Sequence, residues 1–246
     1  MAPCRVQVLL VSDLHYDLRQ FDWVLTAAAE HDAVVIAGDL LDLSSAVPVA
    51  AQIPVIMGYL KRLAERSTVL VGSGNHDLTG RDENGEKAPT WLGAAGQFGV
   101  ITDYRSTFLG DTLVSVCPFW DGPKGRARLD GWLTEQAALV RNDWCWIYRW
   151  PPPDEPVSWT GTRSYGDADL AGWIEQWQPR LVLSGHVHQA PLATGGSWIT
   201  TSGTTTILNA GHELGPIPSH IVIDLDDGRA EWWSYEQTDA RSFVGR

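Results

Sequence analysis

Cysteine and basic residues are both scarce in this sequence of 246 residues. The three cysteines, Cys4, Cys117 and Cys145, form an odd number without the spacing of a metal or redox motif, so no disulfide framework is expected. Lysine and arginine number 18 against 30 acidic residues, which gives a formal net charge of −12. Proteins that bind nucleic acid usually carry a basic stripe that neutralises phosphates, and the lack of one here argues against a nuclease.

Long apolar runs are missing too. The apolar run near the N-terminus is short and soon reaches Asp13, so it does not have the form of a signal peptide. No stretch is long enough for a transmembrane helix. We therefore expect a cytoplasmic location and no membrane association. Because no segment has the composition of an interdomain linker, residues 1–246 are expected to form a single domain.

The first third of the chain alternates apolar strands with helices. Strands are expected over Arg5–Ser12, Ala33–Gly38 and Ser67–Gly74, and helices over Phe21–Glu30 and Val47–Arg66, with Pro54 setting a start or a kink. Strands that are apolar throughout and separated by helices indicate a mostly parallel sheet that is covered on both faces.

The remainder of the chain predicts a second group of strands. Three are expected over Thr112–Trp120, Trp144–Tyr148 and Arg180–Gly185, with helices over Lys124–Val140 and Asp167–Trp177. The tail is strand-rich, in "TTTILNAG", "HIVIDL" and "RAEWWSY", and the sequence Asp-Asp-Gly between the last two is a hairpin-turn signal. The whole pattern predicts an α/β fold of two mixed sheets with helices outside.

Polar residues with metal-binding side chains follow four of these strands. They are Asp13 and His15 in "SDLHYD", Asp39 in "AGDLLD", Asn75, His76 and Asp77 in "GSGNHDLTG", and His186 and His188 in "SGHVHQ". Because strand ends in an open α/β sheet converge on one crevice, the sequence predicts one site built from four loops. The glycines before Asp39, Asn75 and His186 would let the backbone turn sharply and approach a ligand closely.

Each motif alone has an ordinary structural explanation. An aspartate after a strand is more often a helix cap than a ligand, "GNHD" is also a turn rich in capping residues, and paired histidines can hydrogen-bond within a core. Four such motifs at four strand ends are not expected by chance. Their carboxylate, imidazole and carboxamide groups suit Mn²⁺, Fe or Zn²⁺ held for hydrolysis rather than a structural zinc.

In this order, "DLH", "GDLLD", "GNHD" and "GHVH", together with the following "LNAG", resemble the calcineurin-like metallophosphoesterases over nearly the whole chain. The resemblance implies a four-layer α/β/β/α sandwich with a two-metal centre at the strand ends. It also implies that the first metal is held by Asp13, His15 and His188, that Asp39 bridges both metals, that Asn75 and His186 hold the second, and that His76 is the catalytic histidine.

These residue types suit the hydrolysis of a phosphoester, either a monoester or a diester, on a small phosphorylated substrate. A metal-bound water whose pKa falls toward roughly 7 would supply hydroxide at neutral pH. His76 would then protonate the leaving group, and Asp77 would either orient that imidazole or cap a helix. Manganese or iron is favoured as the metal, with zinc as an alternative, at one or two ions per chain.

One histidine of the family pattern is missing, because no histidine lies between His76 and His186. The matching position, in "YRWPP", is Arg149, whose guanidinium stays protonated and offers no lone pair to a metal. In the first of three outcomes, Arg149 pairs with Asp39 or grips a phosphate, and the second metal is weak or absent. In the second, His212 fills the gap.

In the third outcome, Arg149 stacks on Trp146 or Trp150 and faces away from the site. The favoured function is a metal-dependent phosphoesterase. The alternative is a ligand-binding or regulatory member of the fold, catalytically weakened by an incomplete second metal site. His31 and His220 adjoin no motif and are expected to be structural. The substrate and the oligomeric state are left open.

Overall fold

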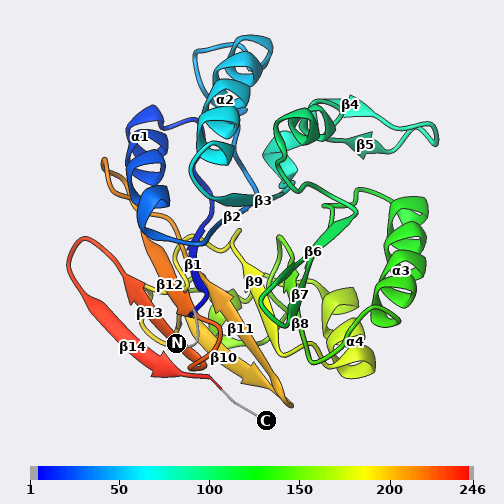
Figure 1. The fold of residues 1–246 in the computed structure, drawn as a ribbon, viewed down its shortest axis with the longest axis vertical. Coiled ribbons are helices and arrows are strands. Elements are labelled where there is room, and N and C mark those ends of the chain that lie inside the picture. Colours follow the sequence, from blue (N-terminus) through cyan, green and yellow to red (C-terminus); the bar gives the residue numbers. More distant parts are fainter. Residues whose placement is uncertain (1–4, 244–246) are drawn as a thin grey trace.

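Two six-stranded sheets form the centre of the molecule in the computed structural model, which describes residues 5–243. They lie face to face with helices on the outer side of each (Figure 1). This is the predicted α/β/β/α sandwich of two mixed sheets. The expected free state of the cysteines holds for Cys117 and Cys145, which are both buried and unbridged, whereas Cys4 lies outside the described residues.

The first sheet has the strand order β14-β13-β12-β1-β2-β3. Its parallel part contains β1 (Gln7–Val11), β2 (Ala33–Ala37) and β3 (Thr68–Gly72). Its antiparallel part contains β12 (His220–Asp224), β13 (Arg229–Trp233) and β14 (Thr238–Ser242). The predicted hairpin between β12 and β13 is confirmed, since its turn contains Gly228 at a φ of +63°.

The second sheet has the strand order β10-β11-β9-β8-β7-β6. The four central strands are parallel: β11 (Thr205–Asn209), β9 (Leu181–Ser184), β8 (Asp143–Ile147) and β7 (Thr112–Val116). The edges, β10 (Ile199–Ser202) and β6 (Arg105–Leu109), run antiparallel to their neighbours. A separate two-stranded ribbon joins β4 (Gly80–Arg81) to β5 (Lys87–Ala88).

The apolar strands have two buried faces because each sheet is covered on both sides. In β1, Val8 and Leu10 pack into the core between the sheets, whereas Leu9 and Val11 pack toward the outer helices. The first sheet is covered by α1 (Leu18–Ala27) and α2 (Val49–Ala64), and the second by α3 (Pro123–Ala137) and α4 (Ala168–Trp177). Successive side chains of a strand point to opposite faces, so this arrangement requires runs that are apolar throughout.

In the two large sheets, three strands, β6, β10 and β14, were not predicted, and all three lie at sheet edges; the short strands β4 and β5 were not predicted either. The side chains of β6, β10 and β14 are largely exposed or half-buried, so these strands lack the apolar run that marks a central strand. Pro54 lies inside α2 and does not set its start. Within residues 5–243, the helices all fall short of the combined length and apolar character that crossing a membrane requires.

Candidate metal centre

The loops that follow β1 and β2 are held together by backbone hydrogen bonds. The amide of Asp13 donates to the carbonyl of Gly38 at 3.1 Å, and the amide of His15 donates to the carbonyl of Asp39 at 3.0 Å. These bonds continue the pairing of the parallel strands past their ends. As a result, the side chains of both loops are placed at one edge of the sheet, as the sequence predicts.

The glycines of the motifs allow this close approach. Gly38 has a φ of +90°, and a Cβ built on Gly74 would lie 2.1 Å from Oδ1 of Asp39. A Cβ on Gly185 would likewise meet the side chain of Ser12 at 2.5 Å. Any larger residue at Gly74 would therefore push the Asp39 carboxylate out of place. The expected sharp turn is confirmed at Gly38, and the close packing at Gly74 and Gly185 is against side chains of neighbouring loops.

Backbone strain is concentrated at the same edge. Eight non-glycine residues with positive φ occur in residues 5–243, and five of them belong to the loops of the centre. These five are Asp13 (57°), His15 (42°), Tyr16 (58°), Asp39 (53°) and His186 (67°). Such conformations cost free energy and persist where the surrounding structure imposes them, often at functional sites.

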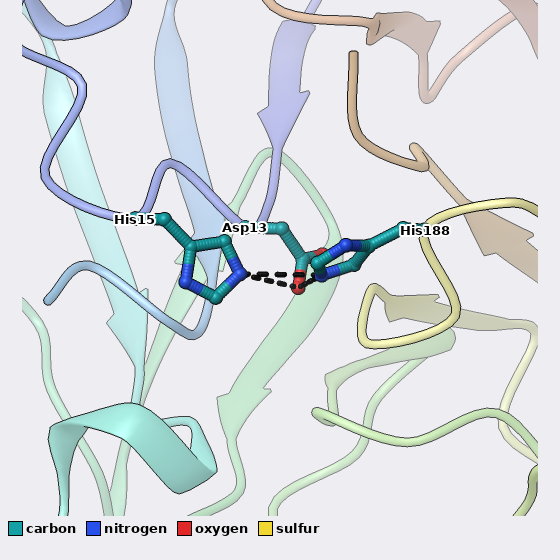
Figure 2. A group of neighbouring side chains, drawn as sticks. All are labelled: Asp13, His15 and His188. Atoms are coloured by element: carbon teal, nitrogen blue, oxygen red, sulfur yellow. Dashed lines mark hydrogen bonds and ion pairs between the residues drawn. The ribbon is translucent and has the colours of Figure 1, made fainter. Parts of the chain in front are cut away.

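Asp13, His15 and His188 form one group of converging donor atoms (Figure 2). Nε2 of His188 lies 3.0 Å from Oδ1 of Asp13 and 3.2 Å from Nε2 of His15. Nε2 of His15 lies 3.8 Å from the same carboxylate oxygen. The carboxylate is fully buried, whereas both imidazoles are partly exposed. Two nitrogens and one oxygen thus face a common point, as a metal ion requires.

His15, Asp39 and His76 form a second group, which shares His15 with the first. The rings of His15 and His76 meet edge to face, with centroids 4.6 Å apart. Asp39 is held by the backbone amide of His76, which donates to its Oδ1 at 2.9 Å. Beside them, the buried Oδ1 of Asn75 has no hydrogen-bond partner among the described residues. A buried carbonyl oxygen without a donor is expected where a cation binds.

Burial keeps two of the imidazoles neutral. It lowers the pKa of His15 to about 4. The charge of Asp13 opposes this shift, whereas His188, His76 and Arg149 add to it. Burial also lowers the pKa of His186 to about 3, and the charge of Arg149 is the next largest cause. Near neutral pH both rings therefore keep the lone pair that a metal ligand needs. The donors present, neutral imidazole, carboxylate and carboxamide oxygen, fit a divalent ion.

Arg149 follows β8 and enters the centre from the second sheet. Its Nη2 donates to Oδ1 of Asp13 at 2.6 Å and to Oδ2 of Asp39 through a short contact, and it lies 3.4 Å from Nδ1 of His186. Nη1 donates to the carbonyl of Ala37 at 3.3 Å. The arginine side chain is only 1% exposed. The predicted pairing of Arg149 with Asp39 is confirmed, and the pairing with Asp13 is an addition.

The buried guanidinium changes the charge state of its neighbours. Burial alone would raise the pKa of Asp13, but Arg149 and His188 outweigh it and hold that pKa well below its ordinary value. For Asp39, burial raises the pKa. The charge of Arg149 opposes this rise, and the charge of Asp13 adds to it. Burial would lower the pKa of Arg149 itself, but the two carboxylates raise it, so the guanidinium stays charged.

The structure does not support the other two expectations for Arg149. Trp150 stacks on His186, with ring centroids 4.5 Å apart and planes 9° apart, and the guanidinium faces the carboxylates instead of Trp146 or Trp150. His212 lies against His15 and His188, at centroid distances of 5.6 and 4.9 Å. It therefore adjoins the first donor group and does not stand in for the position of Arg149.

Asp77 does not orient His76, contrary to one of the two expectations for it. Its fully buried carboxylate accepts hydrogen bonds from the backbone amides of Gly74 at 2.9 Å, and of Leu40 and Leu41 at 3.1 Å each. The contact with Gly74 is the capping role that was the other expectation. Burial, followed by the neighbouring Asp39, raises the pKa of Asp77 to about 8. Asp77 thus fixes the loop that carries Asp39.

Two features of the site were not anticipated from the sequence. The backbone amide of Leu43 donates to Nδ1 of His76 at 3.3 Å, and Trp150 forms the platform under His186. Both depend on contacts between distant loops, for which the sequence carries no short-range signal. His31 and His220 take part in neither donor group, as expected: each contacts a nearby backbone carbonyl, and the ring of His220 stacks on Trp233.

A family model described as calcineurin-like phosphoesterase matches residues 6–190. The fold is similar to that of TT1561 from Thermus thermophilus, with a TM-score of 0.61 and 16% identity over 97% of this chain and 99% of that one. It is also similar to a dimetal phosphatase from Danio rerio, with a TM-score of 0.63 and 11% identity over 97% and 99% of the two chains.

A third solved structure, purple acid phosphatase PPD1 from yellow lupin, matches with a TM-score of 0.55 and 13% identity. That match covers 97% of this chain and 51% of the larger protein. No curated protein matches the sequence. At these low identities the structural matches establish only the shared fold, and membership of the family is shown by the family model.

Proposed function

The chain belongs to the calcineurin-like phosphoesterase family, and on that basis we propose that it hydrolyses a phosphoester in a metal-dependent reaction. The observation that carries the proposal is the convergence of Asp13, His15 and His188 on one point beside the second donor group. The buried Oδ1 of Asn75, which has no hydrogen-bond partner within residues 5–243, supports it independently. A purely structural α/β domain would have no reason to hold these groups together, since buried polar atoms are normally paired.

The residues proposed to hold metal are those at the four strand ends. The first position would be held by Asp13, His15 and His188, and the residues that the family resemblance gives to a second position are Asp39, Asn75 and His186. A divalent ion bound there would act as a Lewis acid toward phosphoryl oxygens and would lower the pKa of water. Manganese or iron remains the favoured metal, because these six residues offer carboxylate, carboxamide and imidazole donors and no thiolate.

His76 is proposed to deliver a proton to the leaving-group oxygen. Because the amide of Leu43 donates to Nδ1, the neutral ring carries its own proton on Nε2. From Nε2 the neutral ring can donate a hydrogen bond that stabilises charge on the leaving-group oxygen, and full transfer of a proton requires the doubly protonated ring. The loop that carries the ring is fixed by Asp77, which accepts three backbone hydrogen bonds. Asp77 would thus act on the reaction by positioning the loop.

The proposed substrate is a small phosphorylated molecule. A cavity of about 310 Å³ lies next to the centre and is lined by aromatic side chains, among them Phe119, Trp120 and Trp150. Trp150 connects the two, since its ring also stacks on His186. An apolar or aromatic leaving group of a monoester or diester would fit this cavity. The net charge of −12 disfavours a nucleic-acid substrate. A cytoplasmic location stays a prediction.

A second candidate function is ligand binding without turnover. The observation that favours it is the ion pairing of Arg149 with Asp13 and Asp39, which ties up two carboxylates proposed as metal ligands. The position of His76 within the donor cluster favours the enzyme, because a binding site of this kind has no need for a proton donor.

Hydrolysis of 4-nitrophenyl phosphate and of bis(4-nitrophenyl) phosphate separates the two functions. For the enzyme, we expect a rate that depends on Mn²⁺, is abolished by a chelator, and falls by about 10²- to 10⁴-fold in His76→Ala. The matched control is His31→Ala, at a histidine that takes part in neither donor group, which should retain the wild-type rate. If neither ester is hydrolysed with Mn²⁺, Fe²⁺ or Zn²⁺, the proposal of an enzyme fails and ligand binding is favoured.

A further inference from the structure

The guanidinium of Arg149 lies where a cation could contact residues from the strand ends of both sheets. Its Nη2 contacts Oδ1 of Asp13, Oδ2 of Asp39 and Nδ1 of His186, which come from three different loops. Any ion bound jointly by Oδ2 of Asp39 and Nδ1 of His186 would have to take the place of this nitrogen. In the first donor group, Arg149 shares one atom, Oδ1 of Asp13, whereas the nitrogens of His15 and His188 contact that oxygen and each other and leave a side open to an ion.

The arginine side chain is confined at its Cδ and at its terminal nitrogens. A Cβ built on Gly38 would lie 2.7 Å from Cδ of Arg149, so the side chain passes directly over that glycine. The terminal nitrogens are fixed at the far end by the carbonyl of Ala37 and by the two carboxylates. Withdrawal of the side chain would leave Asp13 and Asp39 buried next to each other without a compensating charge.

The charge of the centre also limits how many ions it can accept. Two buried carboxylates and one guanidinium leave one negative charge to be neutralised. One divalent ion converts this to one positive charge, whereas two would leave three. A guanidinium in a protein does not lose its proton, so its charge cannot be removed to make room for a second ion.

We propose that this centre binds one divalent ion, at Asp13, His15 and His188, and that the guanidinium of Arg149 permanently takes the place of a second one. The metal itself rests on the proposed function, but the number of ions does not depend on turnover. Repulsion should weaken a second ion by at least about a hundredfold relative to the first.

Metal stoichiometry tests this directly. Protein is equilibrated with Mn²⁺, freed of excess ion and analysed for manganese, and the same samples are examined by electron paramagnetic resonance. We expect one ion per chain and the spectrum of an isolated Mn²⁺ ion. Two ions per chain, or a spectrum of two coupled ions, would overturn the inference. So would the absence of any tightly bound Mn²⁺ or Zn²⁺.

Arg149→His removes the fixed charge and supplies a nitrogen ligand at the same position of the fold. We expect this variant to bind a second Mn²⁺ and to give the spectrum of a coupled pair. The matched control is Arg180→His. Arg180 pairs with Asp143, at a distance of 2.7 Å, and belongs to neither donor group. This variant should still bind one ion. If the Arg149→His protein folds and still binds one ion, Arg149 is not what limits the number.

The two proposals fail in distinguishable ways. One ion per chain without hydrolysis of either ester keeps the assignment of Arg149 and removes the enzyme. Two ions per chain with Mn²⁺-dependent hydrolysis keeps the enzyme and removes the assignment. If Arg149→His does not fold, the stoichiometry and the spectrum of the wild-type protein still decide the question.

Discussion

Arg149 and Arg180 adjoin neighbouring strands of the second sheet and pair with aspartates at similar distances. Arg180, which precedes β9, donates to Asp143 at 2.7 Å and to the carbonyl of Leu225 at 3.2 Å, and its guanidinium lies over the ring of Phe243. Its side chain is 15% exposed and that of Asp143 is 22% exposed. Arg149 is almost completely buried and faces two carboxylates from the other sheet.

The difference lies in what the carboxylates would do without the arginine. Asp143 would turn to water, because it is partly exposed. Asp13 and Asp39 have no access to water, so they require a cation from the chain or from solution. An ion pair between strand ends is thus a local structural contact in one case, and in the other it sets the charge of the whole site.

Arg149→Met should have the largest effect on the metal-free protein. The loss of one partner of a buried pair leaves uncompensated charge, and we expect the free energy of unfolding to fall by about 3–5 kcal/mol. Saturating Mn²⁺ should restore much of this, because a bound ion can take over the neutralisation. Urea unfolding with chelator and with Mn²⁺ measures both effects. A loss under about 1 kcal/mol without metal would contradict the account of the buried carboxylates.

Acidification should have the next largest effect. The pKa of His15 is about 4 in the folded protein against an ordinary value of 6.5. The unfolded chain then binds the proton more readily, so the contribution of this ring to stability is fully present above pH 6.5 and is lost as pH falls toward 4. The difference corresponds to about 3 kcal/mol for this ring alone.

Urea unfolding of metal-free protein between about pH 7 and pH 4 checks this sign and window. The slope should be shallower in Arg149→Met, because Arg149 contributes to the low pKa of His15 and His186. Arg180→Met should keep the wild-type slope. The slopes are compared between variants because Asp77, whose pKa burial raises to about 8, acts in the opposite direction over the same range. An equal slope in the wild-type protein and in Arg149→Met would show that Arg149 does not act on the two rings.

Arg180→Met should have the smallest effect. A partly exposed pair contributes little, so we expect a loss of about 1 kcal/mol, the same with and without Mn²⁺. The measurement is again urea unfolding under the two conditions, and the rate of ester hydrolysis should stay at the wild-type value. A metal-dependent loss in this variant would mean that the two arginines do not differ in the way described above.

Most of the fold could be predicted because its central strands are apolar on both faces. β1, β2 and β3, like β8 and β9, are recognisable runs between turn residues, and the polar motifs follow them directly. The edge strands β6, β10 and β14 were missed because they are largely exposed or half-buried, so their sequences resemble those of loops, whereas β3 was predicted although it also lies at an edge, because it is buried over four of its five residues. The convergence of the donor residues followed from the shared direction of the parallel strands.

The finer arrangement of the site was less accessible. The sequence left Asp77 open between orienting His76 and capping, and the backbone amides around it decided for capping. It also left Arg149 open among three outcomes, of which the tertiary contacts support the pairing with Asp39. A side chain has several staggered conformations, each of which can reach a different neighbour. Only the positions of those neighbours in the folded protein decide which contact is made.

The sequence by itself determined which groups are present: carboxylates, imidazoles and a carboxamide at strand ends, and an arginine where no histidine is available. Chain order and strand period suffice for that, because they are local properties. Only the tertiary structure decided that one guanidinium lies between Asp13 and Asp39 with almost no exposure. Burial and distance control the strength of a charge interaction, and both arise only when the two sheets pack against each other.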